Sequence, residues 1–280
     1  MAGFLNSEPL RSDTKNKSVR AFQRLNTSRS FREKSGRFAM EGYRLILDAV
    51  LSGVQIHELF WTEKAYAQYG EAMETAFSET GNQPDGKLLL SEQLAKEIAD
   101  TDTAQGVFAA AEMLPEQGRM PEKGERVMLL HCVQDPSNLG ALLRTAEALG
   151  TDGIYLYQCC DLYNPKALRS SMGALFRIPV MRIKEMDAFF GHCGRIGLPT
   201  CAAVVDRDAD SLLSADFSGG AAVLIGNEGN GLPREVSNAC TSRMTIPMAP
   251  HSNSLNAAMA AGLFLWELRK SRGERSAGEL

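Results

Sequence analysis

The second half of the chain alternates between short, continuous apolar runs and longer segments in which apolar residues recur at helical spacing. The apolar runs are rich in Val, Ile and Leu, which is typical of strands buried on both faces of a parallel sheet. The alternation therefore predicts an α/β fold with helices on both faces of such a sheet. The expected strands are 127–133, 153–157, 201–205, 221–225 and 244–246, and the expected helices are 139–149, 165–172, 186–193, 233–240 and 254–269.

The first half has a similar pattern and predicts a smaller α/β unit. Helical segments are expected over 15–38, which ends in a turn, from after Tyr43 through Val50, over 63–80 and over 92–100. Strands are expected over 54–61, 87–90 and 106–112. The stretch between the halves is rich in Pro, Gly and charge, which predicts a linker. The expected division is a polar tail over 1–14, a smaller domain over 15–112, a linker over 113–125, a larger domain over 126–272 and a C-terminal tail over 273–280.

Composition limits the size and compartment of the protein. With 280 residues, 44% of them hydrophobic, the chain can form two packed domains. No apolar run reaches the roughly 20 residues of a membrane-spanning helix, so we expect a soluble protein without an export signal. Without a C-x-x-C pair, reduced buried thiols in a cytoplasmic protein are expected rather than disulfides or a metal site. The cysteines are Cys132, Cys159, Cys160, Cys193, Cys201 and Cys240.

Charge is divided unevenly along the chain. The formal net charge is −4, but residues 1–44 hold ten Lys or Arg against four Asp or Glu, a balance of +6. The remaining 20 basic and 30 acidic residues give −10. Because Lys and Arg neutralise phosphates, the asymmetry favours contact with a polyanion near the N-terminus. The alternative is a solvated basic face without a partner.

Ligands of parallel sheets bind at the carboxyl ends of the strands, and three segments there combine Gly, Asn or Pro with reactive side chains. The first, 134–146, follows the strand that ends at Val133 and contains Asp135, Asn138 and Arg144. Taken alone, Asp135 or Asn138 could simply cap the next helix, and Arg144 could be a surface cation.

The other two segments follow later strands. Segment 225–233 has three glycines, which permit positive φ angles and close approach of a ligand to the backbone, although an ordinary turn before a helix is the alternative. Its glycine spacing differs from the G-x-G-x-x-G dinucleotide fingerprint. In segment 246–262, Ser254 is a natural N-cap for the final helix, with Asn256 in the first turn.

In order and content, the three segments resemble the signature motifs of the SpoU, or TrmH, family in the SPOUT methyltransferase superfamily. The segment 164–179 is similar to the family's middle region, and 37–42 and 105–109 resemble its N-terminal substrate-binding domain. The first motif is matched by Asp135, Pro136, Asn138, Gly140 and Arg144, the second by Gly226, Asn227, Glu228, Gly231 and Leu232, and the third by Ile246, Pro247, Met248, Ser254, Leu255 and Asn256. Pro250 and Ala257 depart from the glycine and valine that are usual there.

The resemblance implies a fold, a cofactor and an assembly. The larger domain would be a SPOUT-type parallel sheet with a deep trefoil knot, preceded by a ribosomal-protein-like α/β/α domain that binds RNA. The protein would be a homodimer that uses S-adenosylmethionine. The implied cofactor-binding residues are Gly226, Asn227, Ile246, Met248 and Leu255.

The resemblance also implies methyl transfer to a ribose 2′-hydroxyl of RNA, with 23S-type ribosomal RNA as the expected substrate. Arg144 would act on that hydroxyl, as base or as electrostatic stabiliser. The other implied catalytic residues are Asn138, Glu228, Ser254 and Asn256, and the expected RNA contacts are Arg20, Arg24, Arg29, Arg32 and Arg37. The alternatives are a transfer-RNA methyltransferase, a non-catalytic RNA-binding protein with the same fold, and a nucleotide-binding oxidoreductase, which the missing fingerprint disfavours.

Overall fold

The computed structural model describes residues 16–115, 118–251 and 254–271 of the chain, which divides into two compact units. The first unit contains the described residues up to Pro115 together with Tyr163–Phe176, and the second contains the remainder. The segment 163–176 therefore packs with the first unit, although the sequence pattern assigns it to the larger domain. The tails expected over 1–14 and 273–280 lie outside the described residues.

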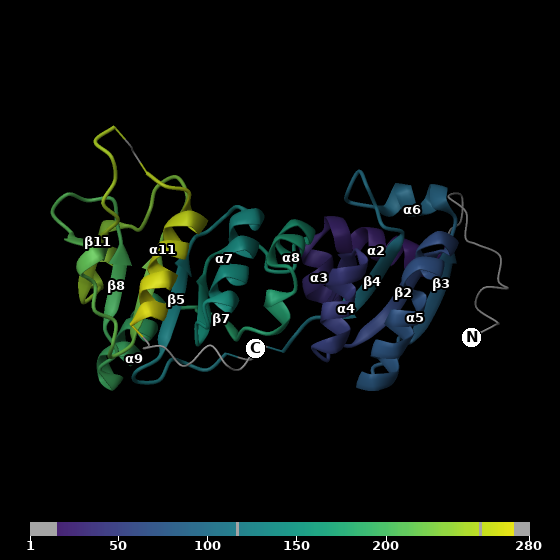
Figure 1. Ribbon diagram of the computed structural model, residues 1–280, viewed down its shortest axis with the longest axis horizontal. Helices are drawn as coiled ribbons and strands as arrows, with labels where there is room; N and C mark the ends of the chain where they lie inside the picture. Colours follow the sequence, from purple (N-terminus) through teal and green to yellow (C-terminus); the bar gives the residue numbers. More distant parts are fainter. Residues whose placement is uncertain (1–15, 116–117, 252–253, 272–280) are drawn as a thin grey trace. The chain divides into compact units, whose positions relative to one another are not determined.

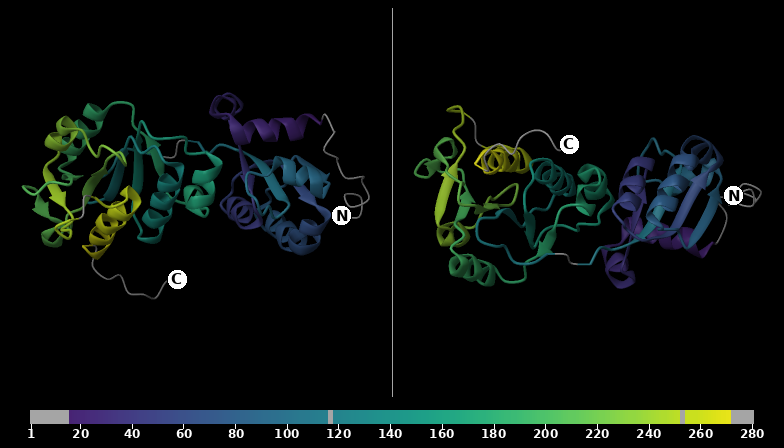
Figure 2. Two further views of the ribbon diagram at one scale, coloured as in Figure 1. Left: turned by 90° about the horizontal axis from the view of Figure 1, so that it is seen from above. Right: turned by 60° about the horizontal axis from the view of Figure 1, so that its bottom comes forward.

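The first unit is a four-stranded sheet between two layers of helices (Figures 1 and 2). The strand order is β1-β4-β2-β3, in which β4 is antiparallel to both neighbours and β2 is parallel to β3. Helices α2 and α6 share a core cluster with one face of the sheet, and α4 and α5 pack together on the other. The elements are α2 (Lys17–Thr27), α3 (Arg29–Ser35), β1 (Arg37–Glu41), α4 (Tyr43–Leu51), β2 (Ile56–Thr62), α5 (Glu63–Thr80), β3 (Gly86–Leu90), α6 (Glu92–Ile98) and β4 (Val107–Glu112).

Helix α2 shows why this unit packs as it does. Its buried side chains recur at helical spacing, and the ring of Phe22 meets Phe60 and Phe108 edge to face at centroid distances of 5.3 and 5.6 Å. Burying each such ring contributes roughly 1.5–3 kcal/mol. Asn16 caps the helix by accepting hydrogen bonds from two backbone amides. The opposite face of α2 carries exposed arginines, so one short helix supplies both core and basic surface.

The segment 163–176 completes the first unit. The ring of Tyr163 lies 4.8 Å from that of Phe38, and its hydroxyl accepts a hydrogen bond from the amide of Leu114 at 2.9 Å. Arg169, on α8 (Pro165–Ser171), pairs with Asp100 at 2.7 Å. These contacts, which join residues far apart in sequence, explain why the segment packs with this unit.

The second unit is built on a seven-stranded sheet with every neighbouring pair parallel. Its strand order is β7-β6-β5-β10-β8-β11-β9. Because the strands are all parallel, their carboxyl ends lie at the same end of the sheet. Helices α9 and α10 pack with the core on one face, while α7 and α11 pack together on the other (Figure 1). The elements are β5 (Arg126–His131), α7 (Pro136–Ala148), β6 (Gly153–Tyr157), β7 (Val180–Arg182), α9 (Met186–Ile196), β8 (Thr200–Ala203), β9 (Asp210–Ser211), β10 (Ala221–Ile225), α10 (Arg234–Ala239), β11 (Ser242–Thr245) and α11 (Ala257–Lys270).

The parallel α/β fold expected for this half is confirmed, with one local correction at its last helix. The helix begins at Ala257 rather than at Ser254, because Asn256 is its N-cap and accepts hydrogen bonds from the amides of Ala258 and Met259. Ser254 is therefore not the capping residue and is exposed before the helix. At α7, Asp135 is the N-cap and Pro136 occupies the first turn.

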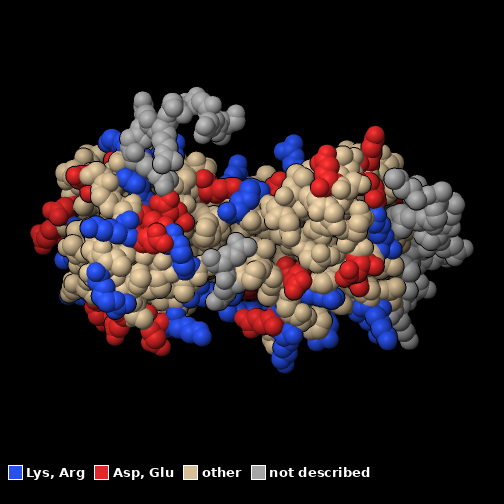
Figure 3. Space-filling model, turned by 90° about the horizontal axis from the view of Figure 1, so that it is seen from below, with Lys and Arg blue, Asp and Glu red and all other residues tan. Residues whose placement is uncertain are grey.

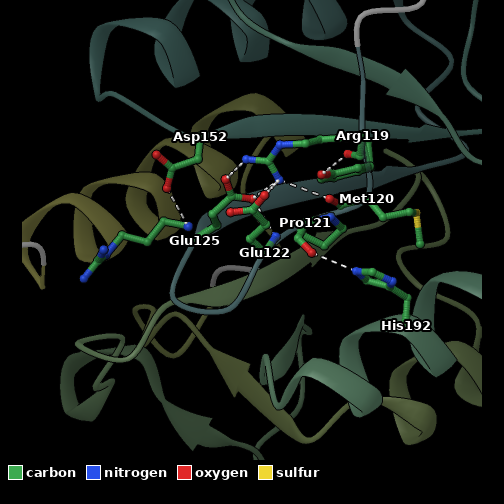
Figure 4. A network of polar contacts seen from close by, with 9 residues as sticks. Arg119, Met120, Pro121, Glu122, Glu125, Asp152 and His192 are labelled. Atoms are coloured by element: carbon green, nitrogen blue, oxygen red, sulfur yellow. Dashed lines mark hydrogen bonds and ion pairs between the residues drawn. The ribbon is translucent and has the colours of Figure 1, made fainter.

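Residues 118–125 are bound to the second unit by a network that we call the linker clamp (Figure 4). Arg119 forms an ion pair with Glu125, whose carboxylate also accepts a hydrogen bond from the amide of Glu122 at 2.8 Å. The hydroxyl of Tyr155 donates to the carbonyl of Arg119 at 2.8 Å, and His192 Nε2 lies 2.8 Å from the carbonyl oxygen of Pro121. This stretch is thus more ordered than its linker-like composition indicates.

The described cysteines are all free thiols. Cys193 and Cys201 are buried, as expected, whereas the other four are partly exposed. Burial raises the pKa of Cys193 and of Cys201 to about 11, so both thiols are protonated and unreactive near neutral pH.

Candidate functional site

Glu228, in the loop after β10, connects two of the three motif segments. Its carboxylate accepts hydrogen bonds from the backbone amides of Gln134 and Asp135 at 3.1 and 2.9 Å. The side-chain amides of Asn138 and Asn227 donate to the same carboxylate at 3.1 and 3.3 Å. Because β5 and β10 are neighbours in the sheet, the loops that follow them lie close enough for one side chain to bridge them.

These donors fix the charge of Glu228. Burial disfavours the charged form, but hydrogen bonds from the backbone of Asp135 and Gln134 and from the side chain of Asn138 stabilise it more strongly. The net effect lowers the pKa of Glu228 below its usual value. The carboxylate is therefore ionised near neutral pH and serves as an acceptor that holds the two loops together.

Asn138 and Asn256 extend this contact to the third motif segment. The side-chain nitrogen of Asn256 donates to Oδ1 of Asn138 at 3.0 Å. Since Asn256 also caps α11, the chain of contacts from Glu228 through Asn138 fixes the position of that helix end. The structure thus brings together three of the predicted catalytic side chains, Asn138, Glu228 and Asn256.

The glycine-rich loop 226–231 is tightly closed on itself. The amide of Asn227 donates to the carbonyl of Gly231 at 3.1 Å, and the reverse bond is 2.9 Å long. A Cβ on Gly226 would lie 2.1 Å from the carbonyl carbon of Gly231, so only glycine fits there. The side chain of Asn227 completes the loop by donating to the carbonyl of Cys132 at 2.9 Å and accepting from the amide of Gly229 at 2.9 Å.

A pocket of about 650 Å³ opens beside this loop. Five predicted site residues line it: Gly226, Asn227, Glu228, Ser254 and Leu255. The predicted cofactor residues Ile246 and Met248 are half-buried and are not among the described residues that line the pocket.

The pocket has the size and lining expected for the implied cofactor. Ligand sites of roughly 300–1,000 Å³ with apolar walls and a few polar groups are typical of small molecules. Here the apolar wall includes Val205, Leu232 and Phe264, and the loop 226–231 lines one side. These residues fit a nucleoside with an attached amino acid such as S-adenosylmethionine.

Sequence reasoning missed three charged residues of this pocket, Asp206, Arg234 and Arg243. Asp206, which follows β8, and Arg243, on β11, both line it and form an ion pair with each other. The strands β8 and β11 are neighbours in the sheet, but these two residues are far apart in the sequence. A pattern confined to one segment therefore carries no signal for this pair.

Arg144 lies on the exposed surface of α7. Among the described residues, its guanidinium has no hydrogen-bond or ion-pair partner in the chain. Elsewhere in this unit, arginines are often paired, as Arg177 is with Glu147 and Arg243 with Asp206. An arginine without such a partner can bind an anion from outside the chain.

The predicted RNA-binding arginines differ in their surroundings. Arg20 and Arg24 are exposed on α2, and the guanidinium of Arg24 lies 3.9 Å from the ring centroid of Phe31. Arg29 is exposed and pairs with Glu33 at 2.8 Å, while Arg37 is partly exposed at the start of β1.

The prediction for Arg32 is wrong. Its residue is only 3% exposed, and its guanidinium donates to the carbonyls of Leu25 and Asn26 near the end of α2. These contacts satisfy carbonyls that the helix end leaves unpaired, so Arg32 has a structural role and is not accessible to RNA.

The charge on the surface is mixed. Figure 3 shows Lys and Arg side chains interspersed with Asp and Glu over one face of the molecule. In the described part of the chain, no helix is both long and apolar enough to cross a membrane.

Two family models match the chain. The model of the SpoU rRNA methylase family matches residues 125–266, and that of the MRM3-like substrate-binding domain matches residues 16–109. Together they cover the regions of both structural units in which the motif residues and the basic helices lie.

Individual relatives match over almost the whole chain. An uncharacterized tRNA/rRNA methyltransferase of Synechocystis is 30% identical, covering 94% of this chain and 97% of the relative. The 23S rRNA (guanosine(2553)-2′-O)-methyltransferase RlmP of Bacillus subtilis is 29% identical, covering 91% of this chain and 97% of its own. The crystal structure of the SpoU methyltransferase AviRb of Streptomyces viridochromogenes with AdoMet superimposes with a TM-score of 0.78, at 27% identity, covering 92% and 98% of the two chains.

Proposed function

The chain belongs to the SpoU rRNA methylase family, and we propose that it transfers the methyl group of S-adenosylmethionine to a ribose 2′-hydroxyl of 23S-type ribosomal RNA. The observation that carries this proposal is the contact of Glu228 with Asn138, and of Asn138 with Asn256. These contacts join all three motif segments at the edge of a pocket that fits the cofactor. The names of relatives such as RlmP support the ribosomal substrate.

The cofactor-binding residues are those of the glycine-rich loop and the start of α11. Gly226 and Asn227 line the pocket as part of the closed loop, and Leu255 offers apolar contact to the bound nucleoside. Ile246 and Met248, which follow β11 but do not line the pocket, belong to the proposed set as the resemblance implies. When bound, S-adenosylmethionine would supply an electrophilic methyl group, and the closed loop would hold the cofactor beside the motif residues.

Arg144 acts on the ribose hydroxyl. A guanidinium has a pKa above about 12, so it is poorly suited to remove a proton. It is well suited to stabilise the negative charge that develops on the attacking oxygen and to bind the adjacent phosphate. The proton that the hydroxyl loses passes to an oxygen of that phosphate or to water. Asn138, Glu228, Ser254 and Asn256 hold the segments on which the hydroxyl and the methyl group meet.

RNA is the substrate because the accepting group is the 2′-hydroxyl, which DNA lacks. Arg20, Arg24 and Arg29 of the first unit contact its phosphates, and Arg37 also contacts the RNA. Removing two phosphate contacts should reduce the slope of log affinity against log salt by roughly 1.4–1.8. The variant Arg20→Ala/Arg24→Ala tests this slope, and Arg195→Ala, an exposed arginine of α9, is the control.

Two such chains form a homodimer through α11. Three large apolar side chains are exposed there at helical spacing: Met259 at 66%, Leu263 at 43% and Trp266 at 57%. A stripe of this kind is typical of an interaction surface. We place the dimer in the cytoplasm, where free thiols persist and ribosomal RNA is found.

The division of labour follows the two family models. Residues 15–112 bind RNA and 113–125 connect the domains. Residues 126–272, apart from the segment 163–176 that packs with the first unit, carry out methyl transfer, with the segments 225–233 and 246–256 forming the trefoil knot that the resemblance implies. The tails 1–14 and 273–280 lie outside the described residues.

Incubation with labelled S-adenosylmethionine and three unmodified acceptors tests this function. Ribosomal RNA should be labelled, whereas transfer RNA and DNA of the same sequence as the ribosomal target should not. Labelling of transfer RNA alone would replace the ribosomal assignment with the transfer-RNA alternative. Binding of RNA and cofactor without labelling of any acceptor would favour a non-catalytic protein.

A further inference from the structure

A small cavity in the first unit is lined by residues of α2, α3 and the sheet. Its volume is about 220 Å³, equal to roughly seven water molecules at about 30 Å³ each. This is below the roughly 300–1,000 Å³ of sites for larger organic ligands, but it is room for one flat ring system.

The helices give the cavity an aromatic and apolar wall. Phe22 and Leu25 of α2 are almost fully buried, and Phe31 of α3 is partly exposed. The exposed guanidinium of Arg24 lies over the Phe31 ring at 3.9 Å from its centroid. Aromatic rings and arginine planes are the surfaces on which RNA-binding proteins stack unpaired bases.

The sheet places one donor and one acceptor at the same cavity. Ala110 on β4 pairs with Ala39 on β1 and with Glu58 on β2, so these three side chains share a face of the sheet. Arg37, two residues before Ala39, points to that face as well. Arg37 and Glu58 both line the cavity.

Both charged groups have hydrogen-bonding capacity left for a ligand. Glu58 accepts one hydrogen bond, from the hydroxyl of Ser18 at 2.7 Å, and a carboxylate has about four acceptor positions. The guanidinium of Arg37 has no hydrogen-bond or ion-pair partner among the described residues. A carboxylate disfavours a phosphate in the cavity itself, which points to a neutral base rather than to the RNA backbone.

We infer that this cavity binds an unpaired guanine base of the substrate RNA, an inference that rests on the proposed function. The Watson–Crick edge of guanine carries two adjacent N–H donors, which match a carboxylate, and a carbonyl acceptor, which matches a guanidinium. Adenine and cytosine place a ring-nitrogen acceptor beside their amino group, which would face the carboxylate of Glu58. Uracil has a single N–H between two carbonyl groups.

Binding of short RNAs to the full chain tests the inference. The probes are fluorescein-labelled pentamers of uridine in which the central residue is guanosine, inosine or adenosine, followed by fluorescence anisotropy. The guanosine pentamer should bind at least about fivefold more tightly than the adenosine pentamer. Inosine, which lacks the 2-amino donor, should fall between them.

Substitution of Glu58 gives the decisive comparison. Glu58→Gln should bring the guanosine-to-adenosine ratio close to one. Glu33→Gln, on exposed α3, removes the same charge away from the cavity and should leave the ratio unchanged. Because both variants lose one negative charge, the ratio rather than the affinity is diagnostic. Thermal unfolding of both variants shows whether the fold is retained, and Glu58→Asp, which keeps the carboxylate, should preserve part of the preference.

Equal binding of the guanosine and adenosine pentamers by the native chain would overturn the inference, as would an unchanged ratio in folded Glu58→Gln. Either result leaves the proposed function intact if ribosomal RNA is still methylated. A chain that shows the guanosine preference but methylates no RNA would instead contradict the proposed function.

Discussion

Hydrogen-bond networks lie at both ends of the strands in the seven-stranded sheet. They differ in the ligand-binding groups that they leave available. At the end where β5 and β6 begin, Arg119 of the linker clamp forms an ion pair with Glu125 (Figure 4). The carbonyl of Arg119 accepts a hydrogen bond from the hydroxyl of Tyr155. At the carboxyl ends of the strands, Glu228 accepts hydrogen bonds from the backbone of the loop after β5, beside a pocket. Arg144 has no hydrogen-bond or ion-pair partner among the described residues.

The difference shows that the density of polar contacts does not by itself identify a functional site. The clamp satisfies its own charges and holds a chain segment in place. The Glu228 network also holds segments in place, but it does so around a pocket and near an available cation. Substitutions at the two ends of the strands should therefore have different consequences for activity and for stability.

The largest effect is expected for Arg144→Ala. Loss of the group that we propose stabilises the developing charge should lower the rate of methyl transfer by at least roughly 10²–10³-fold, while the affinity for S-adenosylmethionine changes little. Single-turnover transfer and calorimetric cofactor binding measure the two quantities. Arg195→Ala, on the other face of the sheet, is the matched control; parallel loss of rate and cofactor affinity in Arg144→Ala would refute the assigned role.

Gly226→Ala should mainly affect cofactor binding. The added methyl group would collide with the backbone of Gly231, and relief of such overpacking costs roughly 1–3 kcal/mol. We expect the dissociation constant for S-adenosylmethionine to rise by about 5- to 150-fold. Gly229→Ala, where a Cβ would make only an ordinary contact at 3.6 Å, should bind the cofactor nearly as well as the native chain. Similar affinities of the two variants would contradict this account of the loop.

Glu228→Gln should loosen the joined loops. The amide retains one acceptor but directs its own donors at the amides of Gln134 or Asp135 and at Asn138. We expect the transfer rate to fall by about tenfold, with a loss of roughly 1–2 kcal/mol in the free energy of unfolding. Glu235→Gln, an exposed change on α10, controls for charge. A variant with native activity and stability would show that the bridge is dispensable.

The same variant has a predictable pH dependence. Because folding lowers the pKa of Glu228, its stabilising contribution is present above the unfolded-state pKa of about 4.3 and is lost as the pH falls through the lower folded-state pKa. The difference in melting temperature between the native chain and Glu228→Gln should therefore be larger at pH 7 than at pH 3. A difference that grows on acidification would have the wrong sign.

The smallest effect on activity is expected in the linker clamp, at the opposite end of the strands. Glu125→Gln weakens the ion pair with Arg119, which is more than half exposed, so the loss of stability should be small. The transfer rate should stay within about twofold of the native value. Melting temperature and transfer rate measured together check this, and a large drop in rate would mean that the clamp contributes to the site.

Most of the fold could be predicted because its strands are buried on both faces. The expected strands 153–157 and 221–225 coincide with β6 and β10, since continuous apolar runs leave little choice of boundary. The pattern does not predict β7 or β9, which have three and two residues, or β1, which begins and ends with a charged residue. In such short or mixed segments, pairing with a neighbouring strand decides the structure.

The site was predictable where its residues belong to local motifs. Asn138, Glu228 and Asn256 each stand in a recognisable segment, and the structure brings them together. Asp206 and Arg243 meet only because β8 and β11 are neighbours. Arg32 was predicted to bind RNA but is buried, because the sequence of a basic segment does not show which of its arginines packs against a helix end.

The central claim is tested most directly by mapping 2′-O-methyl groups in unmodified ribosomal RNA after reaction with the native chain and S-adenosylmethionine. Alkaline hydrolysis cleaves next to every free 2′-hydroxyl and spares a methylated one. The account predicts one new alkali-resistant position in the large-subunit RNA, which is missing when Arg144→Ala replaces the native chain. Incorporated methyl groups that leave every position sensitive to alkali would place the modification on a base and contradict the account.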